Sequence, residues 1–226
     1  MVAAFGCAFA LWLPAHTSLP AVCGALSRIP ARDLLLLMGP GWTLANAAAG
    51  WIVMLVAMMP PLLAEPMRHV WFASLPRRRT WAAVLFVSAY VFVWTLAAPV
   101  LLLLTWTCRG SGSEMQDVAV GLGAALLWSA SPLAQHARNR CHRVLRVGAA
   151  GHRADRECVS YGLYAGAMCV AVCWPWMLVV LLVESAHLAV MLAIGLWLIM
   201  DRLFPPRRPA WQLPPALGRA MWRLTR

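Results

Sequence analysis

The feature that most constrains this chain is a series of long apolar blocks that contain no charged residue. Residues 81–105 and 162–182 are two such blocks. A helix of about 18 or more apolar residues is long enough to cross the hydrocarbon core of a bilayer. Hydrophobic residues make up 62% of the chain and charged residues 12%, whereas a soluble domain is about half apolar and a quarter charged. The pattern predicts an all-α, polytopic transmembrane helical bundle.

The apolar blocks predict five or six membrane spans. The blocks cover residues 2–13 with an extension toward 26, and residues 44–63, 81–105, 118–133, 162–182 and 187–203. The first block is short, has no charged residue before it, and is followed by Pro14 and Pro20. It fits a weak first span, a signal-like segment or the remainder of a truncated helix.

The positions of the basic residues predict how the chain is oriented. All 19 of them are arginine, and all but Arg28, Arg32 and Arg109 lie between residues 64 and 80, between 134 and 161, or after 201. The connections 106–117 and 183–186 contain few. The positive-inside rule therefore places the arginine-rich loops and the C-terminus in the cytoplasm, which for a bacterial chain would put the spans in the inner membrane. The net charge of +11 reflects these short loops, so we expect no nucleic-acid partner.

We expect three regions along the chain. Residues 1–41 form the weak first span and an outer loop, residues 42–205 form a five-helix membrane domain, and residues 206–226 form a basic cytoplasmic tail. In the tail, Leu217, Met221 and Leu224 share one helical face, and arginines occupy the other. This pattern predicts an interfacial amphipathic helix on anionic membrane lipid, with a disordered basic tail as the alternative.

Sulfur-containing side chains in two of the spans are the main candidates for chemistry. Met54 and Met58 are one helical turn apart and are followed by Met59, while Cys169, Cys173 and Met177 follow one another at intervals of four. Residues four apart lie on the same face of a helix. Thiolates and thioethers are soft ligands that select Cu(I) over hard cations. Packing is the alternative, since methionine and free cysteine are common fillers of apolar cores.

The predicted topology places the two sulfur groups at similar depth. At about 1.5 Å per residue, Met54 lies ~14 Å from the inner end of its span, whereas Cys169 and Cys173 lie ~10 Å and ~16 Å from the inner end of theirs. The two spans run antiparallel. If they are neighbours, the thioethers of Met54 and Met58 and the thiols of Cys169 and Cys173 meet near the middle of the bilayer. We expect a metal site there, with Pro61 ending or kinking the first of these helices.

Five further residues are secondary candidates for metal ligands. Two histidines and a thiol occur in the sequence HARNRCHR of an arginine-rich loop, and a glutamate and a histidine flank a short outer loop. These residues are His136, Cys141, His142, Glu184 and His187. Their alternative role is that of ordinary solvated loop residues.

Short motifs in a fixed order within residues 42–205 resemble a known family. They are Trp51-x-x-Met54-x-x-Ala57-Met58-Met59-x-Pro61, Tyr90 with Trp94, Ser131-Pro132-Leu133 with Cys141, Gly162-Leu163-Tyr164 with Cys169, Cys173-Trp174 and Met177, and Asp201-Arg202. The ordered set resembles a bacterial family of predicted metal-binding integral membrane proteins, a domain of unknown function with copper-chaperone-like properties. The resemblance implies metal binding and copper handling.

The chain departs from the family pattern at several positions. Ala134 and Ala137 replace a lysine and a cysteine in the loop motif, and Ala171 and Val172 replace a glycine and a cysteine in the helix motif. The family's short outer loop, G-x-M-N, is also absent here. The missing sulfur ligands imply substitutes, for which His136, His142 and His187 are available.

Taken together, these features predict a membrane copper chaperone or metal-handling accessory that binds Cu(I) and supplies a copper-enzyme client or another membrane subunit. No enzyme is expected, because the chain contains no metalloprotease, serine-hydrolase or phosphate-loop motif. Two alternatives remain. One is a non-metal structural or assembly subunit that uses Gly121, Gly123, Ala124 and Ala125 for contacts with a partner span. The other is a metal permease.

Overall fold

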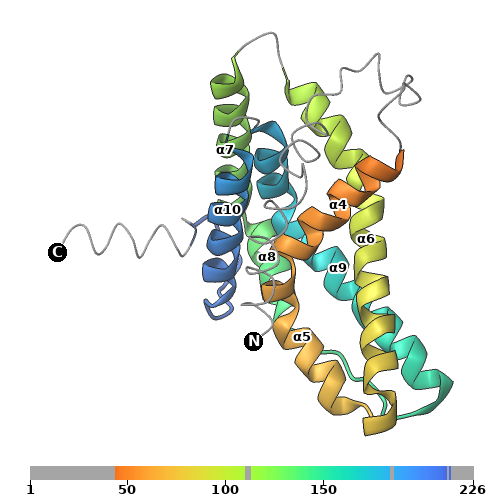
Figure 1. Ribbon diagram of the computed structural model, residues 1–226. Coiled ribbons are helices and arrows are strands. Elements are labelled where there is room, and N and C mark those ends of the chain that lie inside the picture. Colours follow the sequence, from red (N-terminus) through yellow and green to blue (C-terminus); the bar gives the residue numbers. More distant parts are fainter. Residues whose placement is uncertain (1–43, 110–112, 184–185, 213, 215–226) are drawn as a thin grey trace. The chain divides into compact units, whose positions relative to one another are not determined.

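The computed structural model describes residues 44–109, 113–183, 186–212 and 214. The predicted first span, residue Glu184 and the predicted tail helix lie outside this part of the chain. All regular elements among the described residues are helical, which confirms the all-α class: α4 (Leu44–Met58), α5 (Pro60–Ala73), the 3-10 turn η2 (Pro76–Arg78), α6 (Arg79–Cys108), α7 (Glu114–Ala130), α8 (Pro132–Cys141), α9 (Gly151–Leu182) and α10 (His187–Arg202) (Figure 1).

Proline and helix capping determine the breaks between α4 and α5 and between α7 and α8. Pro60 occupies the first position of α5, where its missing N–H is not needed, and α4 and α5 meet at a bend of 71°. The helix therefore restarts after Met59, where the sequence predicted an end or a kink at Pro61. In the same way Ser131 caps α8 by accepting a hydrogen bond from the Ala134 N–H, and Pro132 opens the helix. The bend there is 69°.

Helices long and apolar enough to cross a membrane are present. Two of them, Pro76–Cys108 and Gly151–Leu182, qualify on their own, and up to four segments qualify if each bent pair counts as one span. Helix α10 has 16 residues and falls short of a full span. The expected count of five or six spans stays a prediction. Helix α6 exposes apolar side chains at roughly helical spacing: Trp81, Val84, Phe92, Leu96, Val100, Leu103 and Trp106.

The chain divides into two compact units, which are described separately. The first contains the residues up to Pro61, Val100–Ala125 and Pro175–Ile199. Its interior includes the buried run from Leu178 to Leu182 on α9, together with Val183, which follows the helix. On α7, Gly121 lies against this run, because a Cβ atom at Gly121 would come within 2.7 Å of Leu182 Cδ1. Trp176 and Trp197 pack together with ring centroids 5.4 Å apart.

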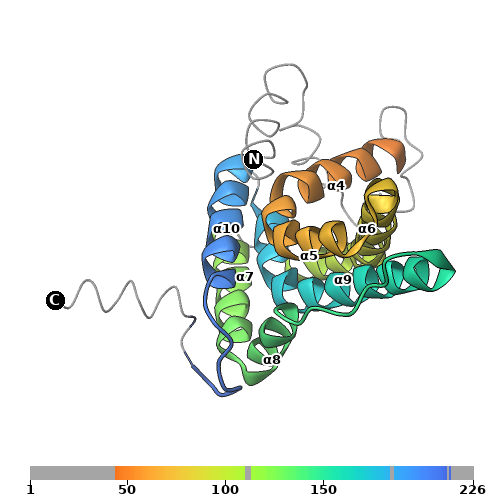
Figure 2. The same cartoon turned by 90° about the horizontal axis from the view of Figure 1, so that it is seen from below.

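The second unit contains Leu62–Pro99, Leu126–Trp174 and the residues from Met200 onward. Helices α5, α6 and α9 supply its core, which consists of Val70, Ala82, Phe86, Cys158 and Tyr161. Figures 1 and 2 show α5 beside the first half of α6. Helices α6 and α9 approach closely, because a Cβ atom at Gly162 would lie 2.8 Å from Ala89 Cβ and in contact with the Phe86 backbone.

We predict that Gly162→Ala destabilises the protein by about 1–3 kcal/mol, the usual cost of overpacking. The added methyl group would push against the backbone of α6, which cannot move aside as a flexible side chain does. The thermal unfolding of detergent-solubilised protein measures this effect.

The matched control is Gly123→Ala on α7, since no atom lies within 4 Å of its added Cβ. Alanine should leave stability unchanged there or raise it by up to about 1 kcal/mol. Equal unfolding temperatures for the two variants would contradict the close approach of α6 and α9.

Candidate metal site

Two thiols on α9 form the centre of the candidate site. Cys169 and Cys173 are one helical turn apart, each has only 2% of its surface exposed, and their Sγ atoms are 3.7 Å apart. Both are free cysteines, as are the other cysteines among the described residues. We call these two residues the thiol pair. The sequence predicted their common helical face, and the structure shows both sulfur atoms buried together.

Helix α6 contributes an aromatic hydroxyl to the thiol pair. The Tyr90 O–H donates a hydrogen bond of 3.0 Å to Cys169 Sγ, and both Tyr90 and Trp94 are buried. Gly166 permits this contact, because a Cβ atom there would lie 3.2 Å from the Tyr90 carbonyl oxygen. A hydroxyl that donates to sulfur stabilises the thiolate form that binds metals.

The role of Tyr90 was not predicted from the sequence, where it served only as part of a motif. A usable signal was present: the tyrosine carries a polar hydroxyl within a long, mainly apolar block, and polar groups in such blocks usually face a protein interior. The sequence does not give the register of α6 against α9, and this register places Tyr90 opposite Cys169.

A third cysteine and an arginine lie close to the thiol pair. Cys141 and Arg202 each interact electrostatically with Cys169, and Arg202 Nη2 lies 3.4 Å from the Cys141 carbonyl oxygen. Cys141 ends α8 and Arg202 ends α10, so both belong to the second unit together with the thiol pair. The loop cysteine predicted as a secondary ligand is therefore near the central thiols.

An ion pair fixes the end of α10 next to this group. Arg138 Nε lies 2.7 Å from Asp201 Oδ2, and both side chains are almost completely buried. Arg138 also donates to the Gln135 side chain over 2.8 Å. The pair joins α8 to the end of α10 and thereby holds Arg202 near Cys141.

The thioethers belong to the first unit. Met54 and Met58 lie one turn apart on α4 and are buried together with Met59, and Met177 on α9 is fully buried. The structure thus shows two separate sulfur groups: buried methionines on α4, and the thiol pair on α9. The predicted convergence of thioethers and thiols on one ion stays a prediction.

The other secondary candidates have different surroundings. His136 is exposed on α8. Burial lowers the pKa of His142 below its ordinary value, and the charge of Arg202 lowers it further. His142 therefore favours the neutral form, which is the form that binds metals. His187 is buried, with its Nδ1 3.2 Å from the Val183 carbonyl oxygen.

The donor set of the thiol pair fits a soft metal ion. Two thiol sulfur atoms 3.7 Å apart could both bind one soft metal ion, since metal–thiolate bonds are about 2.3 Å long. No group of three or more His, Cys, Asp or Glu side chains suited to a metal occurs among the described residues. A completed site would therefore need further ligands of another type, and thioether sulfur is the type that matches a soft ion.

A family model described as "PpoB2: Copper chaperone" matches residues 48–224. No curated protein and no solved structure matches the chain.

We predict that Asp201→Ala destabilises the protein by about 3–5 kcal/mol, because the buried guanidinium of Arg138 would lose its counter-charge. Chemical unfolding in detergent measures the loss. The double variant Arg138→Met/Asp201→Leu removes both charges and should recover most of the stability. If the double variant were as unstable as the sum of its two single variants, the two side chains would not be coupled.

Proposed function

The chain belongs to the PpoB2 copper chaperone family, and from that premise we propose that it binds Cu(I) inside a membrane and hands the ion to a client protein. Copper is the cargo in this proposal rather than a resident cofactor. The observation that carries the proposal is the buried thiol pair, with its sulfur atoms 3.7 Å apart and the Tyr90 hydroxyl directed at one of them.

Binding is an exchange of protons for a metal ion. Each thiol releases its proton as its sulfur binds the ion, so affinity should fall as pH falls. One Cu(I) and two thiolates leave a net charge of −1, which is costly to bury without a counter-ion. Arg202 interacts electrostatically with both thiols and compensates this charge.

Thioethers would complete the coordination. Met54 and Met58 are neutral ligands and add no charge, so they can bind Cu(I) without a further counter-ion. Met59 and Met177 are also buried and remain candidates. Neutral ligands exchange without a proton transfer, which suits an ion that has to be passed on. Transfer would proceed by ligand substitution, in which a donor of the client replaces one sulfur after another. No redox step is required.

We propose five or six spans in a bacterial inner membrane, with the arginine-rich connections and the C-terminus in the cytoplasm. The apolar side chains exposed along α6 support a lipid-facing position, since large exposed apolar surfaces are uncommon on soluble monomers. The partners would be membrane lipid and a copper enzyme or another membrane subunit. No catalytic step is part of the proposal.

One observation bears on the alternative of a structural subunit. Its proposed contact face on α7 contains Gly121 and Ala125, and both are buried. Gly121 packs against Val179 and Leu182 of the chain's own α9. Close packing within the protein therefore accounts for this glycine without a partner span, while Gly123 and Ala124 remain exposed.

Copper content tests the proposal. Protein purified anaerobically with reductant should bind Cu(I) in proportion to the chain, and Cys169→Ser/Cys173→Ser should lose most of it. The control Cys108→Ala/Cys158→Ala removes two other thiols and should retain the metal. Negligible copper in the wild type, or copper that the Cys169→Ser/Cys173→Ser variant still retains, would contradict the proposal. Copper flux in sealed vesicles would instead indicate a permease.

The thioethers require a separate test. Met54→Leu/Met58→Leu should weaken Cu(I) affinity in a chelator competition while leaving stability nearly unchanged, since leucine and methionine have similar volumes. The exposed Met115 provides the control Met115→Leu. Unchanged affinity in the Met54→Leu/Met58→Leu variant would remove these thioethers from the site and leave the thiol pair as the binding group.

A further inference from the structure

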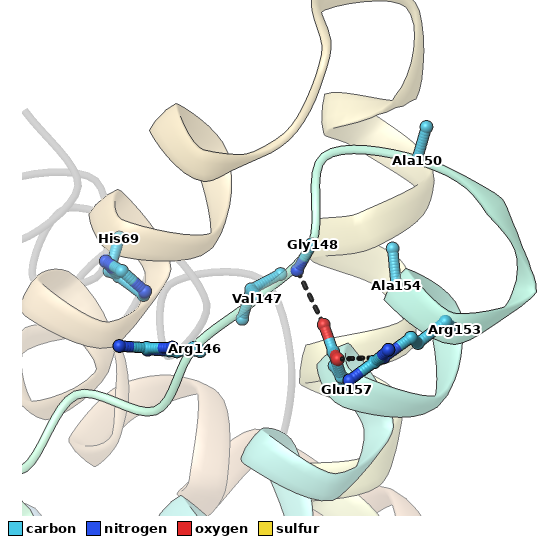
Figure 3. Close-up of a pocket in the computed structure, with 8 residues that line it drawn as sticks. All are labelled: His69, Arg146, Val147, Gly148, Ala150, Arg153, Ala154 and Glu157. Atoms are coloured by element: carbon cyan, nitrogen blue, oxygen red, sulfur yellow. Dashed lines mark hydrogen bonds and ion pairs between the residues drawn. The ribbon is translucent and has the colours of Figure 1, made fainter.

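A basic pocket opens at the end of the second unit where α9 begins. The cavity has a volume of about 470 Å³, which is within the range of small-ligand sites. It is lined by His69, Arg146, Val147, Gly148, Ala150, Arg153, Ala154 and Glu157, and we call it the basic pocket. Figure 3 shows its lining coming from α5, from the connection between α8 and α9, and from α9 itself.

The positive charges of the basic pocket are available to a ligand. Arg146 is exposed and has no hydrogen-bond or ion-pair partner in the part of the chain that the structure describes. Arg153 donates through Nε to Glu157 Oε1 over 3.1 Å, which leaves its two terminal amino groups outside this contact. Two guanidinium groups and a single carboxylate thus line the pocket, with Arg146 and Arg153 on opposite sides of the view in Figure 3.

That carboxylate is already engaged. Glu157 accepts one hydrogen bond from Arg153 and another from the Gly148 N–H, the latter of 2.7 Å (Figure 3). The connection between α8 and α9 is therefore bonded to Glu157 and holds the carboxylate at the pocket wall.

The start of α9 adds a second feature that favours an anion. Gly151, at φ +86°, turns the chain into α9. The first N–H groups of a helix have no partner within the helix and favour an anion.

Exposed aromatic side chains lie near the pocket in the chain and indicate its position relative to the membrane surface. Phe72 and Trp81, at the end of α5 and the start of α6, are both exposed. The turn between them is tied to the pocket loop, because the Leu75 N–H donates to the Ala149 carbonyl oxygen over 3.4 Å. Exposed aromatic residues next to arginines are typical of the interface between a bilayer and water, where lipid headgroups lie.

We infer that the basic pocket binds a phosphate group, attracted by the positive charges of Arg146 and Arg153 that line the pocket at the start of α9. Two sources offer this chemistry: the headgroup of an anionic phospholipid and a soluble phosphate. The exposed aromatic residues favour the lipid. The inference does not depend on copper binding, so it stands or falls separately from the proposed function.

Calorimetric titration of the detergent-solubilised full chain tests the inference. The probes are dihexanoyl-phosphatidylglycerol, dihexanoyl-phosphatidylcholine and inorganic phosphate, each titrated separately. The anionic lipid should bind and the zwitterionic lipid should not. Arg146→Gln/Arg153→Gln should weaken binding by about tenfold or more, since hydrogen bonds to charged groups are the strong ones.

The matched control is Arg143→Gln/Arg156→Gln, which removes the same charge from the same loop and the same helix outside the pocket lining. It should bind the probe as the wild type does. If Arg146→Gln/Arg153→Gln fails to fold, the single variants Arg146→Gln and Arg143→Gln make the same comparison.

Each outcome decides the question. Selective binding of the anionic lipid supports a lipid headgroup, and equal binding of inorganic phosphate supports a soluble phosphate. The inference is overturned if neither dihexanoyl-phosphatidylglycerol nor inorganic phosphate binds. It is also overturned if Arg146→Gln/Arg153→Gln and Arg143→Gln/Arg156→Gln lose affinity equally, because an equal loss would indicate a diffuse attraction to the arginine-rich surface.

Discussion

The contact between α6 and α9 is the constraint on which the candidate site depends. Gly162 and Gly166 let the two helix backbones approach more closely than side chains would allow. That approach sets the register in which the Tyr90 hydroxyl meets Cys169 Sγ. With larger residues at either glycine, the helices would separate, and the Tyr90 hydroxyl would lose its hydrogen bond to Cys169 Sγ. The same packing also closes the core around Phe86 and Tyr161, so stability and chemistry in the second unit share one cause.

Charged residues lie on one side of the thiol pair. The buried pair of Arg138 and Asp201 anchors the end of α10 to α8, and the next residue, Arg202, interacts electrostatically with Cys141 and with both members of the thiol pair. Buried charges cost free energy unless they are paired. In the proposed function the site alternates between protonated thiols and a metal-bound thiolate pair and so changes its own charge, and a fixed cation nearby would reduce the cost of the anionic state.

Much of this arrangement could be predicted from the sequence, and the limits have physical reasons. Apolar runs identified the helical class and most helix cores, because a spanning helix must be apolar. They missed the polar start of α9 at Gly151 and the helical state of α8, where hydropathy carries no signal. Spacing of four placed Cys169 and Cys173 on one face, since that depends only on local geometry. The partner groups Tyr90, Arg202 and Asp201 come from distant parts of the chain, and their approach follows from tertiary packing.

The central claim is that a copper ion is held by sulfur from the thiol pair, and X-ray absorption at the copper edge tests it most directly. Anaerobically loaded protein should show Cu(I) with sulfur neighbours, and most of that signal should vanish in Cys169→Ser/Cys173→Ser. A coordination shell of nitrogen or oxygen, or a sulfur shell that this variant leaves intact, would contradict the account.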